Sequence, residues 1–406
     1  MIHSLRALRY RDYRIFLSGQ GLALIGTWCQ RVAIAWLVYR TTHSALLLGL
    51  AAFAGEICLL LVAPFGGLIA DRVQRVPALI AVQVVSALQA FTLAILVALG
   101  WASFPAIVAL ALLLGACQAI EMPLRQAMFS DLVPDTRDLP NAIALMAFMN
   151  NGGRLIGPIL AGFAISLAGE NLCFAINGFG YLWVIFALLR LRVPRNQAHS
   201  SGHPLAELAA GFAYAWDCQP IRATLGLLLT VGFCYLPYLV VMPVFTHDVL
   251  HGDARMLGYL LSAAGAGAVG GLFWIASSAH VHNVPRLLAL SAGTGSIGML
   301  VLSISSTTVP AMLAMAAVGF GIVVTATASN IYLQWMAEPA KRGRVLGLYT
   351  MCFMGVAPIG NLIAGSLIER LGCATTLMLL GLLGLTGTAW FQRHRLRFQQ
   401  VAEAAR

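Results

Sequence analysis

Long apolar runs separated by short polar segments make up this chain. Each run is roughly 20 to 25 residues long, the length a helix needs to cross the hydrocarbon core of a bilayer. The strands of a membrane barrel would instead alternate apolar and polar positions over about ten residues. The pattern therefore predicts an all-α integral membrane protein with twelve transmembrane helices. We place them near residues 15–39, 45–69, 77–100, 103–126, 141–167, 172–190, 222–246, 256–279, 286–304, 309–336, 345–368 and 373–391.

The longest polar interruption falls near the middle of the chain, between Arg190 and Arg222, and has the composition of a linker. Behind it, apolar residues at helical spacing predict a short amphipathic helix on the membrane surface. These residues are Leu205, Leu208, Ala209, Phe212 and Trp216. We therefore expect a six-helix bundle at 1–190, a linker with this helix at 191–221, a second six-helix bundle at 222–392 and a cytoplasmic tail at 393–406.

Part of the first half is repeated in the second. Residues 134–149 resemble residues 339–354 at an offset of 205, and Gly157–Gly162 resembles Gly360–Gly365 at an offset of 203, half the chain length. Parallel halves related by an axis along the membrane normal produce such a repeat. The repeat supports a 6+6 arrangement with pseudo-two-fold symmetry.

Composition and charge indicate the class of protein and its orientation. Hydrophobic residues make up 60% of the chain and charged residues 10%, whereas a soluble domain carries about 25% charged residues. The net charge of +10 does not indicate nucleic-acid binding, because twenty of the 25 basic residues fall on one side of the predicted membrane. Arg40, Arg255 and Arg370 lie on the other side, and Arg31 and Arg154 lie within spans. Cytoplasmic loops carry such an excess, so both termini are expected in the cytoplasm.

A glycine-rich charged turn, GGLIADRVQR at residues 66–75, joins the second and third spans. It resembles the cytoplasmic loop between helices 2 and 3 of the major facilitator superfamily, G-x-x-x-D-R-x-G-R-R, although Gln74 and Val76 depart from that pattern. The resemblance implies a solute transporter in which this loop latches the two halves together. The residues it assigns to the gating loop are Gly67, Asp71, Arg72 and Arg75. Ordinary cytoplasmic charge is the alternative interpretation.

The corresponding turn of the second half, residues 277–286, lacks this pattern. A carboxylate is favoured at the N-terminal turn of a helix. We therefore expect Asp71 to face the start of the eleventh span near Arg344, in a latch that has no counterpart in the other half.

The fifth span carries the run GRLIGPILAG at residues 153–162. It resembles the helix-5 pattern of drug:proton antiporters in the same superfamily, G-x-x-x-G-P-x-x-G-G, with Ala161 replacing one glycine. The proline bends the helix, and the small residues let the fifth span pack closely against the eighth. The motif residues are Gly153, Arg154, Gly157, Pro158 and Gly162. The resemblance implies a seal that favours exchange over uniport, and a merely kinked packing helix is the alternative.

Four charged side chains lie well inside the predicted spans, all in the first half: Arg31, Glu56, Glu121 and Arg154. A charge near the middle of the membrane costs roughly 3 kcal/mol or more unless it is paired or hydrated, so we expect Arg154 to pair with Glu56 or Glu121. A carboxylate beside a mobile arginine can gain and lose a proton as solute exchanges. Glu56 is the first candidate proton carrier and Glu121 the second, and a static ion pair that fixes helix packing is the alternative.

The second half offers aromatic and polar groups for a cavity lining. The candidates are Phe233, Tyr235, Tyr238, Thr325 and Asn330. They lie on the seventh and tenth spans, and in the superfamily helices 1, 4, 7 and 10 line the cavity. Together with the charges of the first half they suit a bulky amphipathic solute. Interfacial aromatics, and hydroxyls bonded to their own backbone, are an equally common explanation.

Further segments narrow the resemblance to one branch of the superfamily. Residues 5–16, 125–127 and 131–134 look like those of bacterial exporters that include enterobactin exporters, macrolide efflux pumps and transmembrane secretion effectors. The resemblance covers nearly the whole chain and implies efflux across the bacterial inner membrane. The arginine-rich segment ahead of the first span is interpreted as a lipid headgroup anchor.

The leading hypothesis is an inner-membrane secondary transporter that expels a small amphipathic solute by proton-coupled alternating access. Uptake, or flipping of a lipid-like molecule, by the same fold is the alternative. The eight cysteines show no metal-binding spacing, and no G-x-x-x-x-G-K-[ST], H-E-x-x-H or G-x-S-x-G motif occurs. We therefore expect a monomer with a solute and membrane lipid as partners, and no enzymatic activity, cofactor or nucleic-acid partner. An intramembrane enzyme and a non-transporting sensor are remote alternatives.

Overall fold

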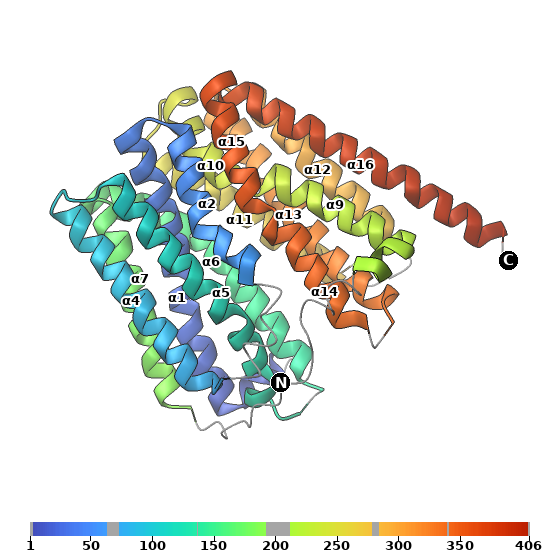
Figure 1. Cartoon of the computed structure of the whole chain (residues 1–406), viewed down its shortest axis with the longest axis horizontal. Coiled ribbons are helices and arrows are strands. Elements are labelled where there is room, and N and C mark those ends of the chain that lie inside the picture. The colour runs from blue at the N-terminus through green and yellow to red at the C-terminus, as the bar shows by residue number, and fades with distance from the viewer. Residues whose placement is uncertain are drawn as a thin grey trace.

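The computed structural model describes residues 3–62, 73–135, 137–191, 212–277, 284–338 and 341–404. Figure 1 shows that these residues fold into long helices packed side by side. The all-α prediction is therefore confirmed for the described part of the chain.

The first half begins with a short 3₁₀ segment, η1 (His3–Arg9), which leads into a series of long helices. These helices are α1 (Arg11–Thr42), α2 (Ala45–Val62), α4 (Arg75–Ala98), α5 (Phe104–Leu132), α6 (Leu139–Ala168) and α7 (Glu170–Leu189).

The second half contains a similar series, in which two segments are broken. Its elements are α9 (Gln219–Tyr235), α10 (Tyr238–Val244), η3 (Phe245–Val249), α11 (Ala254–Ser277), α12 (Val284–Ile304), α13 (Thr308–Met336), α14 (Arg342–Thr350), η6 (Met351–Gly355), α15 (Ala357–Leu371) and α16 (Cys373–Ala404). Pro237 separates α9 from α10, because proline cannot donate the backbone hydrogen bond that would continue the helix. The π-helical turn η6 joins α14 to α15 just ahead of Pro358.

Every predicted span falls on helix in the structure, within the described residues. Eleven helical segments there are long and apolar enough to cross a membrane. The remaining predicted range coincides with α6, which is 30 residues long but whose apolar sequence is interrupted by Asn150, Asn151 and Arg154. The structure thus supports a multi-pass membrane protein.

The end of the chain differs from the prediction. The last span was expected to stop near residue 391, yet α16 continues to Ala404. The sequence after Gly387 contains neither glycine nor proline and is rich in Gln, Arg and Ala. Such residues propagate a helix at little cost, so the polar tail extends the span as helix.

The predicted linker falls largely outside the described residues, which exclude 192–211 and with them Leu205, Leu208 and Ala209. Residues 212–217 are helical, and the rings of Phe212 and Trp216 are 54% and 71% exposed. These two side chains therefore lie on the outer face of the molecule, as an amphipathic surface helix requires.

The helices of each half pack mainly with one another, and the pairs α6–α11 and α2–α15 join the halves. In Figure 1 the first half, blue to green, lies at lower left and the second half, yellow to red, at upper right. The repeat is visible in the turns: Gly169 after α6 and Gly372 after α15 adopt φ values of 84° and 82°, which favour glycine. Large apolar side chains such as Leu88 and Leu313 are more than 60% exposed, as expected for surfaces that face lipid.

Candidate functional site

Trp28 and Arg31, one turn apart on α1, form the centre of a charged cluster. The Nη1 atom of Arg31 lies 4.0 Å from Oε1 of Glu56 on α2. Its Nη2 atom donates a hydrogen bond of 3.3 Å to Oε1 of Gln118 on α5. The side chains of Arg31 and Glu56 are 35% and 27% exposed, so this long, partly accessible ion pair contributes little to stability.

Arg154 on α6 approaches the same indole ring. The guanidinium carbons of Arg31 and Arg154 each lie 5.4 Å from the Trp28 ring centroid. Arg154 donates from Nε at 3.1 Å and from Nη2 at 2.8 Å to the hydroxyl oxygen of Tyr238 on α10, in the other half. Arg154 is only 8% exposed. The guanidinium carbon of Arg154 also lies 5.2 Å from the Tyr238 ring centroid. Each cation–π contact is worth about 2 kcal/mol when desolvated, so the Trp28 and Tyr238 rings offset part of the cost of burying this charge.

The expected pairing of Arg154 with Glu56 or Glu121 is wrong. Within the described ranges, no carboxylate lies within 4.0 Å of Arg154. Glu121 instead accepts a hydrogen bond of 3.2 Å from Arg125, one turn further along α5. Glu56 faces Arg31. Depth in a span indicated which charges lie within the helical bundle, but the neighbours of each charge depend on how the helices are rotated against one another.

Glu56 also contacts the second half of the chain. Its Oε2 atom accepts a hydrogen bond of 3.0 Å from Nδ2 of Asn361 on α15. Asn361 is 3% exposed, and its Oδ1 atom has no hydrogen-bond partner in the described residues. A buried acceptor without a partner costs roughly 1–3 kcal/mol, and a protonated carboxyl group or a solute donor would satisfy it.

The first two glycines of the helix-5 motif position the indole. A Cβ atom at Gly157 would lie 2.5 Å from the Trp28 Cβ atom, and one at Gly153 would lie 3.3 Å from the Trp28 Cδ1 atom. The Sγ atom of Cys29 donates to the carbonyl oxygen of Gly157 at 3.1 Å. The absence of side chains on this face of α6 therefore lets α1 come close enough to bring Trp28 beside Arg154.

The other face of α6 packs against α11, as the small residues predict for the fifth and eighth spans. A Cβ atom at Gly258 would lie 2.5 Å from the carbonyl oxygen of Pro158, and one at Gly162 would lie 2.8 Å from the carbonyl oxygen of Ala254. Farther along α11, a Cβ atom at Gly265 would lie 2.5 Å from the Leu155 Cα atom. The α2–α15 pair repeats this arrangement through Gly49 and Gly365, where a Cβ on either glycine would lie within 3.2 Å of the other's Cα.

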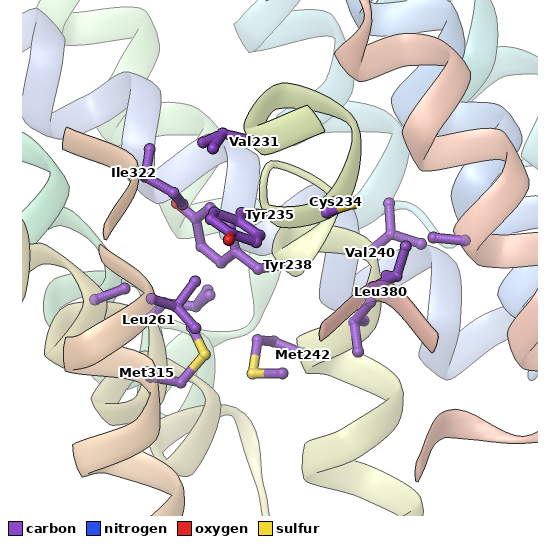
Figure 2. Packing of buried hydrophobic residues seen from close by; sticks show 14 of the residues in the cluster. Val231, Cys234, Tyr235, Tyr238, Val240, Met242, Leu261, Met315, Ile322 and Leu380 are labelled. Carbon is purple, nitrogen blue, oxygen red and sulfur yellow. The ribbon is translucent and has the colours of Figure 1, made fainter. Parts of the chain in front are cut away.

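The predicted lining residues of the second half separate into two groups. Tyr238 joins the charged cluster. Tyr235 is fully buried and donates to the carbonyl oxygen of Ala292 at 2.7 Å, and Thr325 is equally buried and bonded to Ser291. Figure 2 shows Tyr235 and Tyr238 among apolar side chains of the second half. Tyr235 and Thr325 are thus core residues and do not line the site.

Neither of the remaining two lining candidates hydrogen-bonds to the cluster within the described part of the chain. Phe233 is half-buried beside Gly360. A Cβ atom added to Gly360 would lie 2.8 Å from the carbonyl oxygen of Phe233. Asn330 accepts a hydrogen bond of 2.5 Å from Gln334 on the same helix, α13.

Polar contacts also join the halves at the end of the bundle that carries His43, which we call the His43 end. The hydroxyl of Tyr39 donates to Asp248 at 2.5 Å. Oε2 of Glu369, at the end of α15, accepts hydrogen bonds from the backbone N–H of Ala45 at 2.9 Å and of Leu46 at 3.3 Å. Glu369 thus caps the N-terminus of α2, where a carboxylate is favoured.

The gating-loop prediction lies mostly outside the described residues, which exclude Gly67, Asp71 and Arg72. Arg75 begins α4, and its Nη1 atom lies 2.7 Å from Oδ2 of Asp131 at the end of α5. This ion pair is formed within the first half. The interaction of Asp71 with the start of the eleventh span stays a prediction.

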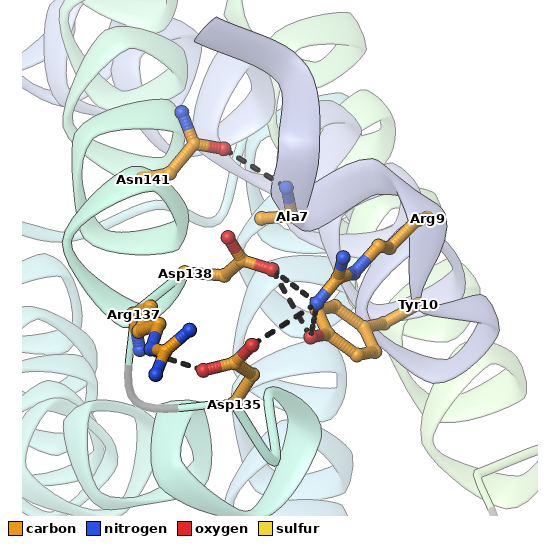
Figure 3. Close-up of polar contacts among 7 residues, drawn as sticks. All are labelled: Ala7, Arg9, Tyr10, Asp135, Arg137, Asp138 and Asn141. Atoms are coloured by element: carbon orange, nitrogen blue, oxygen red, sulfur yellow. Dashed lines mark hydrogen bonds and ion pairs between the residues drawn. The ribbon is translucent and has the colours of Figure 1, made fainter. Parts of the chain in front are cut away.

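The arginine-rich N-terminal segment is held by protein contacts. Figure 3 shows Arg9 and Tyr10 directed toward the turn before α6. Arg9 lies 2.7 Å from the buried carboxylate of Asp138 and 3.4 Å from that of Asp135. The backbone N–H of Ala7 donates to Asn141 Oδ1 at 2.9 Å. Arg9 therefore fastens η1 to the bundle, and the interpretation of the segment as a lipid headgroup anchor does not hold for this residue.

Sequence reasoning missed three members of the cluster: Trp28, Gln118 and Asn361. The sequence contains a signal for two of them. Trp28 precedes Arg31 by three positions and so shares its helix face. Asn361 corresponds to Pro158 at the repeat offset of 203, which places it at the same depth in the second half. Gln118 carries no such signal.

Comparison with known proteins agrees with this architecture. Among curated proteins, the chain is 22% identical to the staphyloferrin A transporter of Staphylococcus aureus, over 95% of this chain and 97% of that protein. It is 29% identical to the multidrug efflux pump Tap of Mycobacterium tuberculosis, over 56% of this chain and 55% of that protein. It is 24% identical to the enterobactin exporter of Shigella flexneri, over 87% and 82%.

Among solved structures, a D-xylose–proton symporter superposes with a TM-score of 0.73 at 13% identity, covering 94% of this chain and 97% of that one. At this identity the match shows the fold alone. The profile of the transmembrane secretion effector family matches residues 2–406. This chain therefore belongs to the transmembrane secretion effector family of the major facilitator superfamily, as its loop and helix-5 motifs indicate.

Proposed function

We propose that this protein is a secondary active exporter of the bacterial inner membrane, which expels a small amphipathic solute by alternating access. The observation that carries the proposal is the charged cluster around Trp28, because it draws side chains from both halves. Arg154 bonds Tyr238 and Glu56 bonds Asn361 across the interface. A solute bound there would contact both halves, so relative motion of the halves would change its access.

The proposed topology has twelve spanning helices, including α6, with both termini in the cytoplasm. The excess of basic residues on one side supports this orientation, which puts the His43 end outside. The contacts of Tyr39 with Asp248 and of Glu369 with α2 then close the outer side. We assign this structure to a state that is closed to the outside.

Energy is proposed to come from the proton-motive force. Glu56 is the first candidate proton carrier, because its carboxylate lies in the cluster, contacts Arg31 and bonds the other half. Glu121, which pairs with Arg125 on the same helix, is the second. The efflux and export functions in the names of the relatives support export, and uptake or lipid flipping by the same fold is the alternative direction.

The decisive experiment uses the full chain in proteoliposomes of defined orientation. Retention of antibiotics, dyes and siderophores by a deletion strain first identifies a transported solute. Efflux of that solute is then measured with a pH gradient and with a membrane potential imposed separately. We expect net outward transport of the solute, and we expect its rate to change when either gradient is imposed. A rate of solute flux that stays the same under both gradients would contradict the proposal.

Two variants rank the proton carriers. Glu56→Gln is expected to uncouple proton movement from solute movement, and Glu121→Gln to leave the coupling intact. Full gradient-driven transport by Glu56→Gln, together with its loss in Glu121→Gln, would reverse the ranking.

A further inference from the structure

The cluster around Trp28 contains more positive than negative charge. Arg31 and Arg154 both place their guanidinium groups beside one indole ring, and the carboxylate of Glu56 lies 4.0 Å from Arg31. The other side chains that contact these groups are neutral: Gln118, Tyr238 and Asn361. With Glu56 ionised, these described residues carry a net charge of about +1.

The excess charge belongs to Arg154. Its side chain is buried, and its hydrogen-bond partner in the described part of the chain is the neutral Tyr238 hydroxyl, which accepts from both Nε and Nη2. A guanidinium group has five N–H donors, so donors remain for a further acceptor. A buried cation in a membrane protein normally has an anionic partner or marks a solute pathway.

We propose that the anionic group of the transported solute supplies this partner, so that the exporter takes carboxylate-bearing amphipathic molecules. The inference rests on the proposed transport function and specifies its substrate class. Arg154 contacts the carboxylate through its free donors, since guanidinium groups bind carboxylates in a planar, two-bond geometry. Trp28, which is half-buried between the two arginines, contacts the apolar or aromatic part of the solute.

An anionic solute also changes the role of Glu56. The solute carboxylate and the Glu56 carboxylate repel each other and compete for Arg31, which is the charged group acting on Glu56 within the described residues. The other side chain that bonds Glu56, Asn361 on α15, is neutral. Neutralising Glu56 therefore strengthens anion binding. The membrane potential, negative inside, drives such an anion outward.

The test compares two dyes that differ at one group, fluorescein and its methyl ester, and adds citrate as a competitor. Binding is measured by fluorescence anisotropy with the full chain in lipid nanodiscs. The expected result is that fluorescein binds at least about tenfold more tightly than the ester. Arg154→Gln should remove this preference, and Glu56→Gln should strengthen fluorescein binding severalfold.

Two further variants separate binding from folding. Arg154→Lys keeps the positive charge but loses the planar geometry, so it should retain part of the preference. Arg370→Gln, an exposed arginine at the His43 end, should bind both dyes as the unchanged protein does. A preference that survives Arg154→Gln, or equal binding of the two dyes with no competition by citrate, overturns the proposal.

Transport of the same dyes distinguishes this inference from the proposed function. Binding of fluorescein that depends on Arg154, without gradient-driven efflux, would support the anion site and refute export. Gradient-driven efflux of the ester at full rate in Arg154→Gln would support export and refute the anion site.

Discussion

Glu369 offers a direct test of how the His43 end stays closed. Its carboxylate, at the end of α15 in the second half, accepts hydrogen bonds from the backbone of Ala45 and Leu46 and from the Ser44 hydroxyl at 3.2 Å. All three donors belong to the N-terminus of α2 in the first half. Glu369→Ala removes every one of these contacts, and they exist only while the two halves meet at this end.

The expected effect follows from the capping geometry. Removal of a capping side chain costs about 1 kcal/mol, within a range of about 0.5–2 kcal/mol. Loss of charge at a helix N-terminus accounts for about 0.3–1 kcal/mol of this. Because Glu369 is exposed, solvent replaces part of the interaction. We therefore expect Glu369→Ala to shift the equilibrium toward opening of the His43 end by about fivefold, and Glu369→Gln by about twofold.

The assay is pulsed electron paramagnetic resonance with spin labels at Leu167 and Ile304, which end α6 and α12 and are 78% and 82% exposed. Labels carried on unnatural amino acids avoid the eight native cysteines. The matched control is Arg370→Gln, next in sequence and equally exposed. The long-distance population should grow in Glu369→Ala and not in the control. Equal distance distributions in the two variants would refute the capping argument.

Three further outcomes are expected. Tyr238→Phe removes the hydroxyl that accepts two hydrogen bonds from Arg154, and it should lower the free energy of unfolding by about 1–3 kcal/mol. Thermal unfolding in detergent measures this loss, and an unchanged midpoint would contradict the role of the hydroxyl as the partner of Arg154. Gly157→Ala should displace Trp28, whose Cβ atom lies 2.5 Å from the added carbon, and shift tryptophan fluorescence, whereas Gly152→Ala, with open space, should not. Asp71→Asn should impair transport in proteoliposomes without preventing membrane insertion, and exchange at the unchanged rate would exclude the latch role.

Much of the fold could be predicted because a bilayer imposes it. A helix must bury its backbone polar groups over a fixed thickness, so the length of each apolar run nearly fixes the helix that forms. The end of α16 was not predicted in this way, because it lies past the apolar run. There the helix propensity of the residues decides where the helix stops. The break between α9 and α10 follows from Pro237, which the sequence displays.

The site was harder to predict. The charges within the spans could be identified by depth, because a charged residue stands out in an apolar sequence. Their partners could not: Arg154 bonds Tyr238 and Glu121 bonds Arg125, where the sequence suggested that Arg154 pairs with a carboxylate. Tyr235 also looked like a lining residue, yet it is buried in the second half.

The sequence by itself thus determined a multi-pass helical membrane protein with two repeated halves, a basic side and four charges within its spans. Only the tertiary structure decided which side chains meet. Contacts such as Glu56 with Asn361 join positions 305 residues apart, and they depend on how closely the helices of the two halves approach. That approach is set by pairs such as Gly49 with Gly365, where a single Cβ atom would force the helices apart. No local pattern encodes the rotation of one helix against a distant one, so the identity of each ion pair emerges only when the halves pack.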